Sequence, residues 1–317
     1  MRLVSSLKTP LRSRWSVAGN DTETLWWPVR NATCLEKKKK KVLLFIPGNP
    51  GLVEYYTDFL EEIHQNASLP LEIFAVSNLG MIATTTTTTA NNNKDDGLFS
   101  LQEQIDHKIA CFDILYKESP DNTEFALMGH SIGAYIAVEV LKKRHSQRIH
   151  RVVTLFPTIR EIGLTPNGIT FTKLFSYLPI SVISTSATLL SYMSAPLLER
   201  LVMLLTGQQG PCAQVTAHRL LKGSVVKNCL YMAQQEMQHV GELDLDFYNA
   251  HADKFVIYYS RNDKWAPLDH YEYMKQRFPE HEHLYLCQQD IPHSFSLEPK
   301  NSSYMANKVV SWLEQRH

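Results

Sequence analysis

The sequence predicts an α/β protein built around a mostly parallel, doubly wound sheet. Short apolar segments of strand length alternate with segments of helical length along most of the 317 residues, and this alternation is typical of βα units. One stretch, residues 157–253, breaks the alternation and is too long for an ordinary crossover connection. We therefore expect a single domain over residues 1–317, with residues 157–253 inserted into it as a helical cap.

The individual elements follow from the spacing of apolar residues. Two short strand-like pieces around Gly19-Asn20-Asp21 predict an antiparallel hairpin at one edge of the sheet. Apolar runs predict further strands at 42–46, 71–76, 124–128, 151–156, 254–259 and 283–287. Helical spacing predicts helices at about 54–66, 98–117, 134–144, 268–277 and 302–315.

The most informative motif is Gly129-His130-Ser131-Ile132-Gly133, between the predicted strand 124–128 and the predicted helix 134–144. It matches Gly-x-Ser-x-Gly, the tight turn that lifts a serine nucleophile to the end of an α/β-hydrolase sheet. Glycine is needed on both sides of the serine because the turn leaves no room for a Cβ atom. The strand, turn and helix together predict an α/β-hydrolase fold with Ser131 as the nucleophile.

A serine nucleophile needs a histidine base and an acid that orients the histidine, and in this fold the acid precedes the histidine. Asp263 follows the predicted strand 254–259, so it is the predicted acid, with capping of the next helix as the alternative. His293 follows the last predicted strand and is the predicted base. The weaker candidates for the acid are Asp269, Asp290 and Asp244.

The oxyanion hole needs two backbone N–H groups that point at the developing negative charge. One is expected from Ile132, directly after the nucleophile. The other is expected from the loop Pro47-Gly48-Asn49-Pro50-Gly51, in which the prolines have no N–H to donate. Asn49 is therefore the predicted second donor. The alternative is that this segment is an ordinary Pro/Gly turn.

Composition argues against several other classes of function. The 32 basic and 32 acidic residues give no net charge, so a general affinity for nucleic acid is not expected. The five cysteines are scattered and form no C-x-x-C, so we expect neither a disulfide framework nor a zinc site, and no cofactor. The N-terminus lacks the apolar core of a secretory signal.

The Thr/Asn-rich segment 84–93 is predicted to be a mobile loop.

Two segments could contact a lipid surface. Residues 174–198 carry no charged side chain and are long enough to cross a bilayer, although Pro179 and Pro196 argue against one straight helix. Three interpretations stay open for them: a buried cap lining an apolar pocket, a hydrophobic hairpin entering a lipid surface, and a transmembrane span. The five lysines at 37–41 are expected in a solvated loop, with an anionic lipid surface as the alternative.

Several motifs of this chain are more distinctive than the serine turn alone. They lie at 46–51, 104–108, 129–133, 155–159, 166–168, 235–237, the Asp263 loop and 291–293. In these motifs the sequence resembles the lipid droplet-associated hydrolase family over most of its length, from about Lys41 to the C-terminus. The combination of Pro-Gly-Asn-Pro-Gly with Gly-His-Ser-Ile-Gly is the most specific part of the resemblance.

The resemblance implies a serine hydrolase of neutral lipid esters, with sterol esters as the substrate class. It implies that Ser131, Asp263 and His293 are nucleophile, acid and base. It also implies a location on lipid droplets and on the cytoplasmic face of the endoplasmic reticulum membrane, and we expect contact with these surfaces through residues 174–198. The competing hypothesis is a droplet-binding or tethering protein that keeps the hydrolase fold but has little activity.

Overall fold

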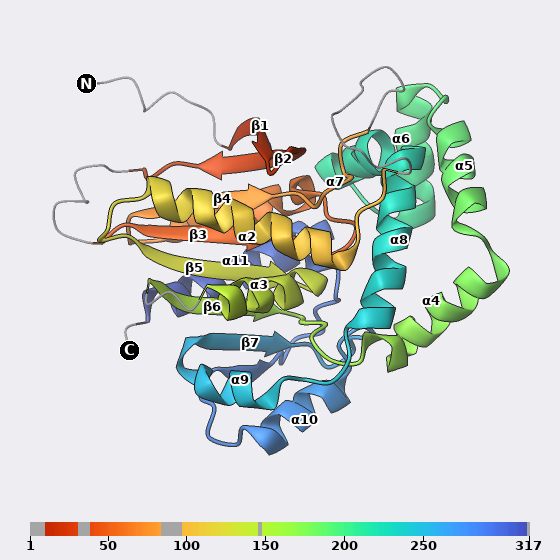
Figure 1. Ribbon diagram of the computed structural model, residues 1–317. Coiled ribbons are helices and arrows are strands. Elements are labelled where there is room, and N and C mark those ends of the chain that lie inside the picture. Colours follow the sequence, from red (N-terminus) through yellow and green to blue (C-terminus); the bar gives the residue numbers. More distant parts are fainter. Residues whose placement is uncertain (1–9, 31–38, 84–96, 145–147, 316–317) are drawn as a thin grey trace, which may run out of the picture.

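The computed structural model describes residues 10–30, 39–83, 97–144 and 148–315; the segment 84–93 therefore lies outside the described residues. Its centre is an eight-stranded sheet in the order β1-β2-β4-β3-β5-β6-β7-β8 (Figure 1). The predicted hairpin is present as β1 and β2, β2 pairs antiparallel with β4, and the remaining pairings are parallel. The strands are β1 (Leu11–Val17), β2 (Asn20–Trp27), β3 (Lys41–Ile46), β4 (Leu71–Val76), β5 (Glu124–His130), β6 (Ile149–Leu155), β7 (Phe255–Tyr259) and β8 (Leu284–Leu286). The predicted fold class is confirmed.

The helices of the sheet layers are α1 (Thr57–Asn66), α2 (Leu101–Glu118), α3 (Ile132–Lys143), α9 (Leu245–Ala250), α10 (Leu268–Arg277) and α11 (Pro299–Glu314). A short 3-10 turn, η2 (Val53–Tyr56), precedes α1. Helix α2 begins three residues later than predicted because Ser100 and Glu103 form a capping box at its start. Helix α11 begins three residues earlier than predicted, with Pro299 in its first turn, where the missing proline N–H costs no hydrogen bond.

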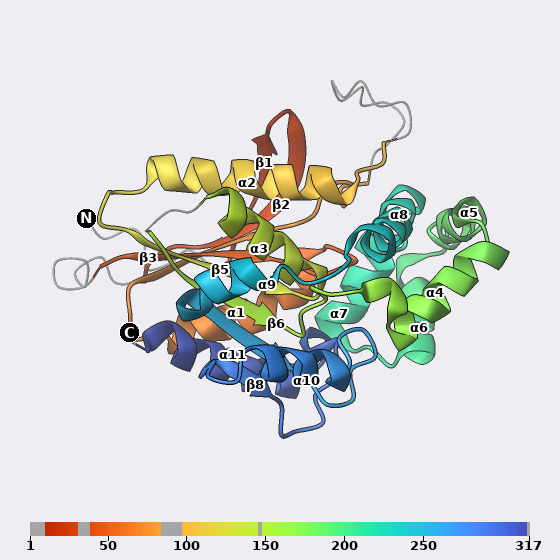
Figure 2. The same cartoon turned by 60° about the horizontal axis from the view of Figure 1, so that its bottom comes forward.

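The sheet is buried on both faces, which is why its parallel strands read as continuous apolar runs. In β3, Val42, Leu44 and Ile46 pack on one face with α2, α3, α9 and α10. Leu43 and Phe45 point to the other face and pack with η2, α1 and α11. Figures 1 and 2 show these helices as two layers around the sheet. The loops after the parallel strands are thus held at one end of a rigid three-layer core.

The remaining helices stand apart from these layers. They are α4 (Pro166–Tyr177), α5 (Ile180–Leu190), α6 (Ala195–Thr206), α7 (Gly210–Val215) and α8 (Gly223–His239), and both views show them grouped beyond one end of the sheet (Figures 1 and 2). Helix α9 does not join them, because Tyr248 stacks on Phe255 of β7 with ring centroids 4.6 Å apart. We therefore propose a cap of α4 to α8, which ends before the predicted limit at residue 253.

The uncharged segment 174–198 covers the end of α4, all of α5 and the start of α6. Only Ser184, Ala187 and Leu198 are buried within it, so the interpretation as a buried segment lining a pocket is wrong for most of its length. No single helix in the described part of the chain has the length and apolar character needed to span a membrane. Helices α4 and α5 reach that length only as a pair, which is bent by 87°.

Candidate active site

Ser131 lies in a sharp turn between β5 and α3. Its φ of 55° is a region that a residue with a Cβ atom rarely adopts. A Cβ on Gly129 would lie 2.1 Å from the Gly133 carbonyl oxygen, and one on Gly133 would lie 2.2 Å from the carbonyl oxygen of Ile46. Both positions therefore require glycine, because a Cβ atom would collide with a backbone carbonyl oxygen.

The structure brings the three predicted side chains together, each from a loop at the carboxyl end of a strand. The Oγ atom of Ser131 lies 2.9 Å from Nε2 of His293, and Nδ1 of His293 lies 2.6 Å from Oδ2 of Asp263. A carboxylate can only accept, so Nδ1 carries the proton and Nε2 is free to accept the Ser131 hydroxyl hydrogen. This is the arrangement of nucleophile, base and orienting acid that acyl transfer requires.

The weaker candidates for the acid lie elsewhere. Asp244 accepts the Phe247 N–H at the start of α9, Asp269 lies in the first turn of α10, and Asp290 accepts a hydrogen bond from Asn262. Asp263 makes the contacts that both interpretations of it require. Its Oδ1 caps the following turn by accepting the N–H groups of Trp265 and Ala266, at 2.7 and 3.0 Å, while Oδ2 faces His293.

The carboxyl group of Asp263 is buried, but its contacts favour the ionised form. Burial raises the pKa of its carboxyl, yet the charge and hydrogen bond of His293 and the two backbone N–H groups together outweigh burial, and the pKa lies below its usual value. A charged Asp263 can fix the orientation of His293 and stabilise its protonated form.

The two predicted oxyanion donors lie beside Ser131. Ile132 is the first residue of α3, where an N–H has no carbonyl one turn earlier in the helix. The loop of Asn49 passes close to Ser131, since a Cβ on Gly48 would lie 2.9 Å from the Cβ of Ser131. Glycine at position 48 therefore lets the backbone of the loop approach Ser131 closely.

A hydrogen-bonded chain that sequence reasoning missed joins this loop to the base. The Gly48 N–H donates to the Tyr56 hydroxyl at 3.3 Å, and that hydroxyl lies 2.7 Å from Nδ1 of His130. The other ring nitrogen of His130 donates to the carbonyl oxygen of His293 at 2.9 Å. Since that carbonyl can only accept, His130 carries its proton on Nε2, and Nδ1 accepts from Tyr56. His130 thus supports the backbone of His293 in its neutral form.

This role of His130 predicts a pH dependence of stability. Burial, and then the nearby His293, lower the pKa of His130 to about 3 from 6.5. Between these values the unfolded chain binds a proton that the folded chain does not, so stability falls as the pH falls from about 6.5 toward 3, by up to about 1.4 kcal/mol per pH unit. Urea unfolding at pH 7 and pH 5 should show a smaller loss for His130→Gln than for the natural chain. Equal losses in the two proteins would contradict the assignment.

A cavity of about 370 Å³ opens beside Ser131 and His293. Its wall is mainly apolar and comes from α4, α8, the segment between α7 and α8, and the Asp263 loop. The apolar lining includes Phe171, Leu220, Leu221, Val226, Leu230 and Trp265. The arrangement can hold a hydrocarbon chain with a carbonyl group at the nucleophile.

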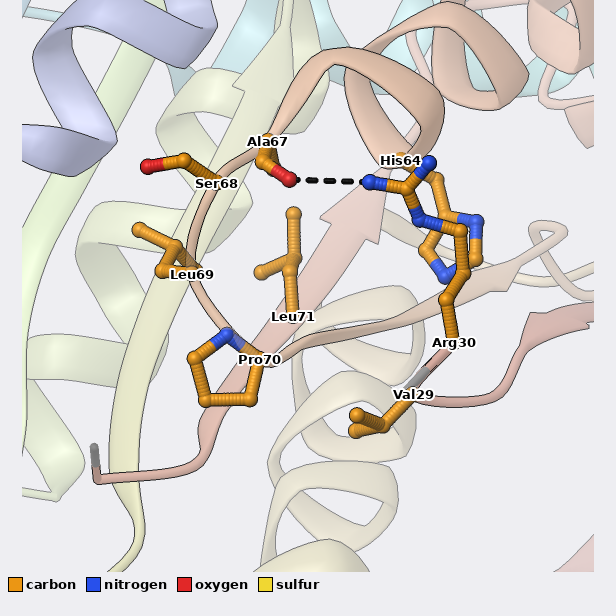
Figure 3. Close-up of a pocket in the computed structure, with 8 residues that line it drawn as sticks. All are labelled: Val29, Arg30, His64, Ala67, Ser68, Leu69, Pro70 and Leu71. Carbon is orange, nitrogen blue, oxygen red and sulfur yellow. Dashed lines mark hydrogen bonds between the residues drawn. The ribbon is translucent and has the colours of Figure 1, made fainter. Parts of the chain in front are cut away.

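A second hollow, of about 170 Å³, lies at the other end of the sheet, where β4 begins (Figure 3). Arg30 closes part of it by donating to the Ala67 carbonyl oxygen at 2.9 Å. It contains no part of the serine site. Within the described ranges, no group of three or more His, Cys, Asp or Glu side chains is placed to hold a metal ion.

Comparisons with known proteins show the family and the fold of this chain. A sequence model of the family described as lipid-droplet associated hydrolase matches residues 39–296. The chain is 30% identical to the lipid droplet-associated hydrolase of Gallus gallus, over 99% of this chain and 98% of the relative, and 29% identical to that of Mus musculus, over 88% and 86%. A soluble variant of monoglyceride lipase from Saccharomyces cerevisiae shares the fold with a TM-score of 0.60, at 16% identity over 98% of this chain and 96% of the lipase. This chain belongs to the lipid droplet-associated hydrolase family and has an α/β-hydrolase fold.

Proposed function

We propose that this protein is a serine hydrolase that cleaves neutral lipid esters at the surface of a lipid droplet, with sterol esters as the substrate class. The observation that carries the proposal is the hydrogen-bonded series from Ser131 through His293 to Asp263 at the mouth of an apolar cavity. The relatives are lipid droplet-associated hydrolases by name, which supports the droplet as the location. From the family resemblance of the sequence motifs we extend the proposed location to the endoplasmic reticulum membrane.

The reaction follows from the order of these contacts. His293 takes the Ser131 hydroxyl proton through Nε2 while Oγ attacks the ester carbonyl carbon. The N–H groups of Ile132 and Asn49 hold the negative charge that forms on the carbonyl oxygen. His293 then gives its proton to the leaving alcohol. A water molecule, deprotonated by His293, releases the fatty acid from Ser131 and restores the enzyme.

The cavity supports an ester with at least one hydrocarbon chain. Its volume of about 370 Å³ is near the lower limit of small-molecule sites. We therefore expect it to take one chain of the ester while the rest of the substrate stays in the lipid phase. Purified protein should release fatty acid from emulsified sterol ester faster than from triacylglycerol; the reverse order would contradict sterol esters as the preferred class.

The exposed apolar side chains of the cap support contact with a lipid surface. Apart from Tyr116, the exposed large hydrophobic residues of the described ranges all lie between Leu164 and Leu205. They include Tyr177, which is 87% exposed, and Leu204, which is 81% exposed. Such a concentration on one part of a protein is typical of an interaction surface. The surface extends past residue 198, beyond the segment predicted from the sequence.

The five lysines at 37–41 are the alternative side for contact with a lipid surface, and the structure favours them less than the cap. Lys37 and Lys38 lie outside the described residues, and Lys39 and Lys40 form ion pairs with Glu124 and Glu72. These pairs lie at the amino ends of the parallel strands, whereas the cap covers their carboxyl ends. We therefore place the lipid surface against the cap.

Removing apolar side chains from the cap should weaken binding to lipid. Two variants test two parts of the surface: Tyr177→Ser with Leu178→Ser, and Leu204→Ser with Leu205→Ser. Each buried leucine contributes about 1.5–3 kcal/mol, so each variant should reduce partition onto phospholipid-coated triolein droplets at least about tenfold. Flotation assays measure the bound fraction. Tyr116→Ser is the control, because Tyr116 is exposed on α2 away from the cap. Unchanged flotation of both cap variants would refute this role of the cap.

The same surface favours a second candidate function, a droplet-binding or tethering protein with weak or no activity. The two functions differ in what Ser131→Ala does. In an enzyme this change removes hydrolysis and keeps droplet binding, whereas in a tether it changes neither. A cap variant that loses droplet binding but still cleaves a soluble ester would favour the enzyme and assign the cap to targeting.

A further inference from the structure

The oxyanion loop contacts a buried carboxyl group that the reaction described above does not use. Glu236 lies on α8, is 6% exposed and lines the cavity beside Ser131. Its Oε1 accepts a hydrogen bond from the side-chain amide of Asn49 at 3.0 Å. The same amide donates to the Cys229 carbonyl oxygen at 2.9 Å, about two turns earlier on the same helix. The Asn49 side chain is thus held by α8, a helix of the cap.

The rest of the loop is attached to the hydrolase core. The Gly48 N–H donates to Tyr56, and the Gly51 carbonyl accepts the Asn78 N–H at 2.9 Å. A thiol contact adds one further link to the cap, from Cys229 Sγ to the Pro50 carbonyl oxygen at 3.4 Å. The middle of the loop, which includes the predicted oxyanion donor, is therefore fixed from the side of the cap.

Glu236 is suited to this place because burial favours its neutral form. Burial raises the pKa of its carboxyl to about 8, and the hydrogen bond from Asn49 offsets this only in part. The other titratable side chains that line the cavity are Cys229, whose pKa burial raises, and His293. A protonated carboxyl can accept the Asn49 amide hydrogen without placing a negative charge near the oxyanion.

We propose that Glu236 is a positioning residue, which holds the Asn49 backbone N–H in place for the oxyanion through the Asn49 side chain. The oxyanion hole is then formed jointly by the hydrolase core and the cap helix α8. This inference rests on the proposed ester hydrolysis. It goes beyond that function by assigning to a cap residue a part in transition-state stabilisation.

Two substitutions of Glu236 test the proposal on a soluble short-chain ester. Glu236→Ala leaves the Asn49 amide without its acceptor, so kcat should fall about 10- to 100-fold with little change in KM, because an oxyanion donor acts in the transition state. Glu236→Gln keeps an acceptor oxygen and should recover kcat to within about threefold of the natural protein. Glu72→Gln, a buried carboxyl at the start of β4, is the matched control and should leave kcat unchanged.

The pH profile separates positioning from a purely structural role. In the natural protein kcat should fall above about pH 8, where Glu236 loses its proton and a negative charge opposes the oxyanion. Glu236→Gln should lack this fall. In addition, Glu236→Ala should cost nothing further in an Asn49→Ala background, since both changes remove one interaction.

Three results would overturn the inference while leaving the proposed hydrolysis intact. The first is a Glu236→Ala protein with the natural kcat. The second is a fall of kcat above about pH 8 that persists in Glu236→Gln. The third is a further loss of kcat when Glu236→Ala is added to Asn49→Ala. Absence of hydrolysis by the natural protein on every ester would overturn both the inference and the proposed function. The isosteric glutamine variant provides the pH test even if the alanine variant does not fold.

Discussion

Replacing Ser131 by alanine should lower kcat for ester hydrolysis by at least about 10⁴-fold, because the variant has no atom that can attack the carbonyl. The Oγ atom is the one that lies 2.9 Å from Nε2 of His293. Any remaining rate would come from the oxyanion donors and the cavity acting on water. Fatty acid release from a soluble ester and from emulsified sterol ester measures the effect.

Two controls accompany this variant. Ser311→Ala removes an exposed hydroxyl on α11 and should leave kcat unchanged. Droplet flotation of Ser131→Ala should equal that of the natural protein, since Ser131 lies beneath the cap and not on its exposed surface. Turnover by Ser131→Ala at the natural rate would refute Ser131 as the nucleophile.

Replacing Asp263 by asparagine should lower kcat by about 10⁴-fold, because asparagine favours the tautomer of His293 that cannot act as a base. Oδ1 accepts two backbone N–H groups, so the amide oxygen of asparagine will occupy that side and its NH₂ group will face His293. Nδ1 must then accept, which places the proton on Nε2, toward Ser131. A protonated Nε2 cannot take the serine proton.

The matched control is Asp269→Asn, in the first turn of α10, where a carboxyl contacts no part of the serine site. Its kcat should stay within about twofold of the natural value. Thermal unfolding should confirm that both variants are folded at the assay temperature. An Asp263→Asn protein with more than about a tenth of the natural kcat would assign the orienting role to another group.

The core of the fold and the serine site could be predicted because their signals are local. Ser131 lies in a motif whose glycines are required by contacts of 2.1 and 2.2 Å, so its backbone geometry is encoded within five residues. Asp263 and His293 follow from chain order, since parallel strands place their carboxyl ends at the same edge of the sheet. Buried strands such as β3, in which residues 42–46 are all apolar, are detected directly from the sequence.

The rest depends on contacts between residues far apart in the chain. Glu236 and Asn49 meet across 187 positions, and nothing in the spacing of α8 marks one carboxyl as buried. Tyr56 and His130 meet across 74 positions. The exposure of residues 174–198 also lies beyond sequence patterns, because an uncharged helix reads the same whether it packs inside a cap or faces a lipid surface. The predicted cap range 157–253 includes α9 for a similar reason, since the contact of Tyr248 with Phe255 is tertiary.

The most direct test of the account is to identify the residue that a fluorophosphonate labels. The natural protein should gain one phosphonyl group, and peptide mass spectrometry should place it on Ser131, because His293 activates that hydroxyl beside the oxyanion donors. The His293→Ala protein should react far more slowly. A protein that hydrolyses lipid esters but carries the label on another residue, or no label at all, would contradict the assignment of Ser131 as the nucleophile.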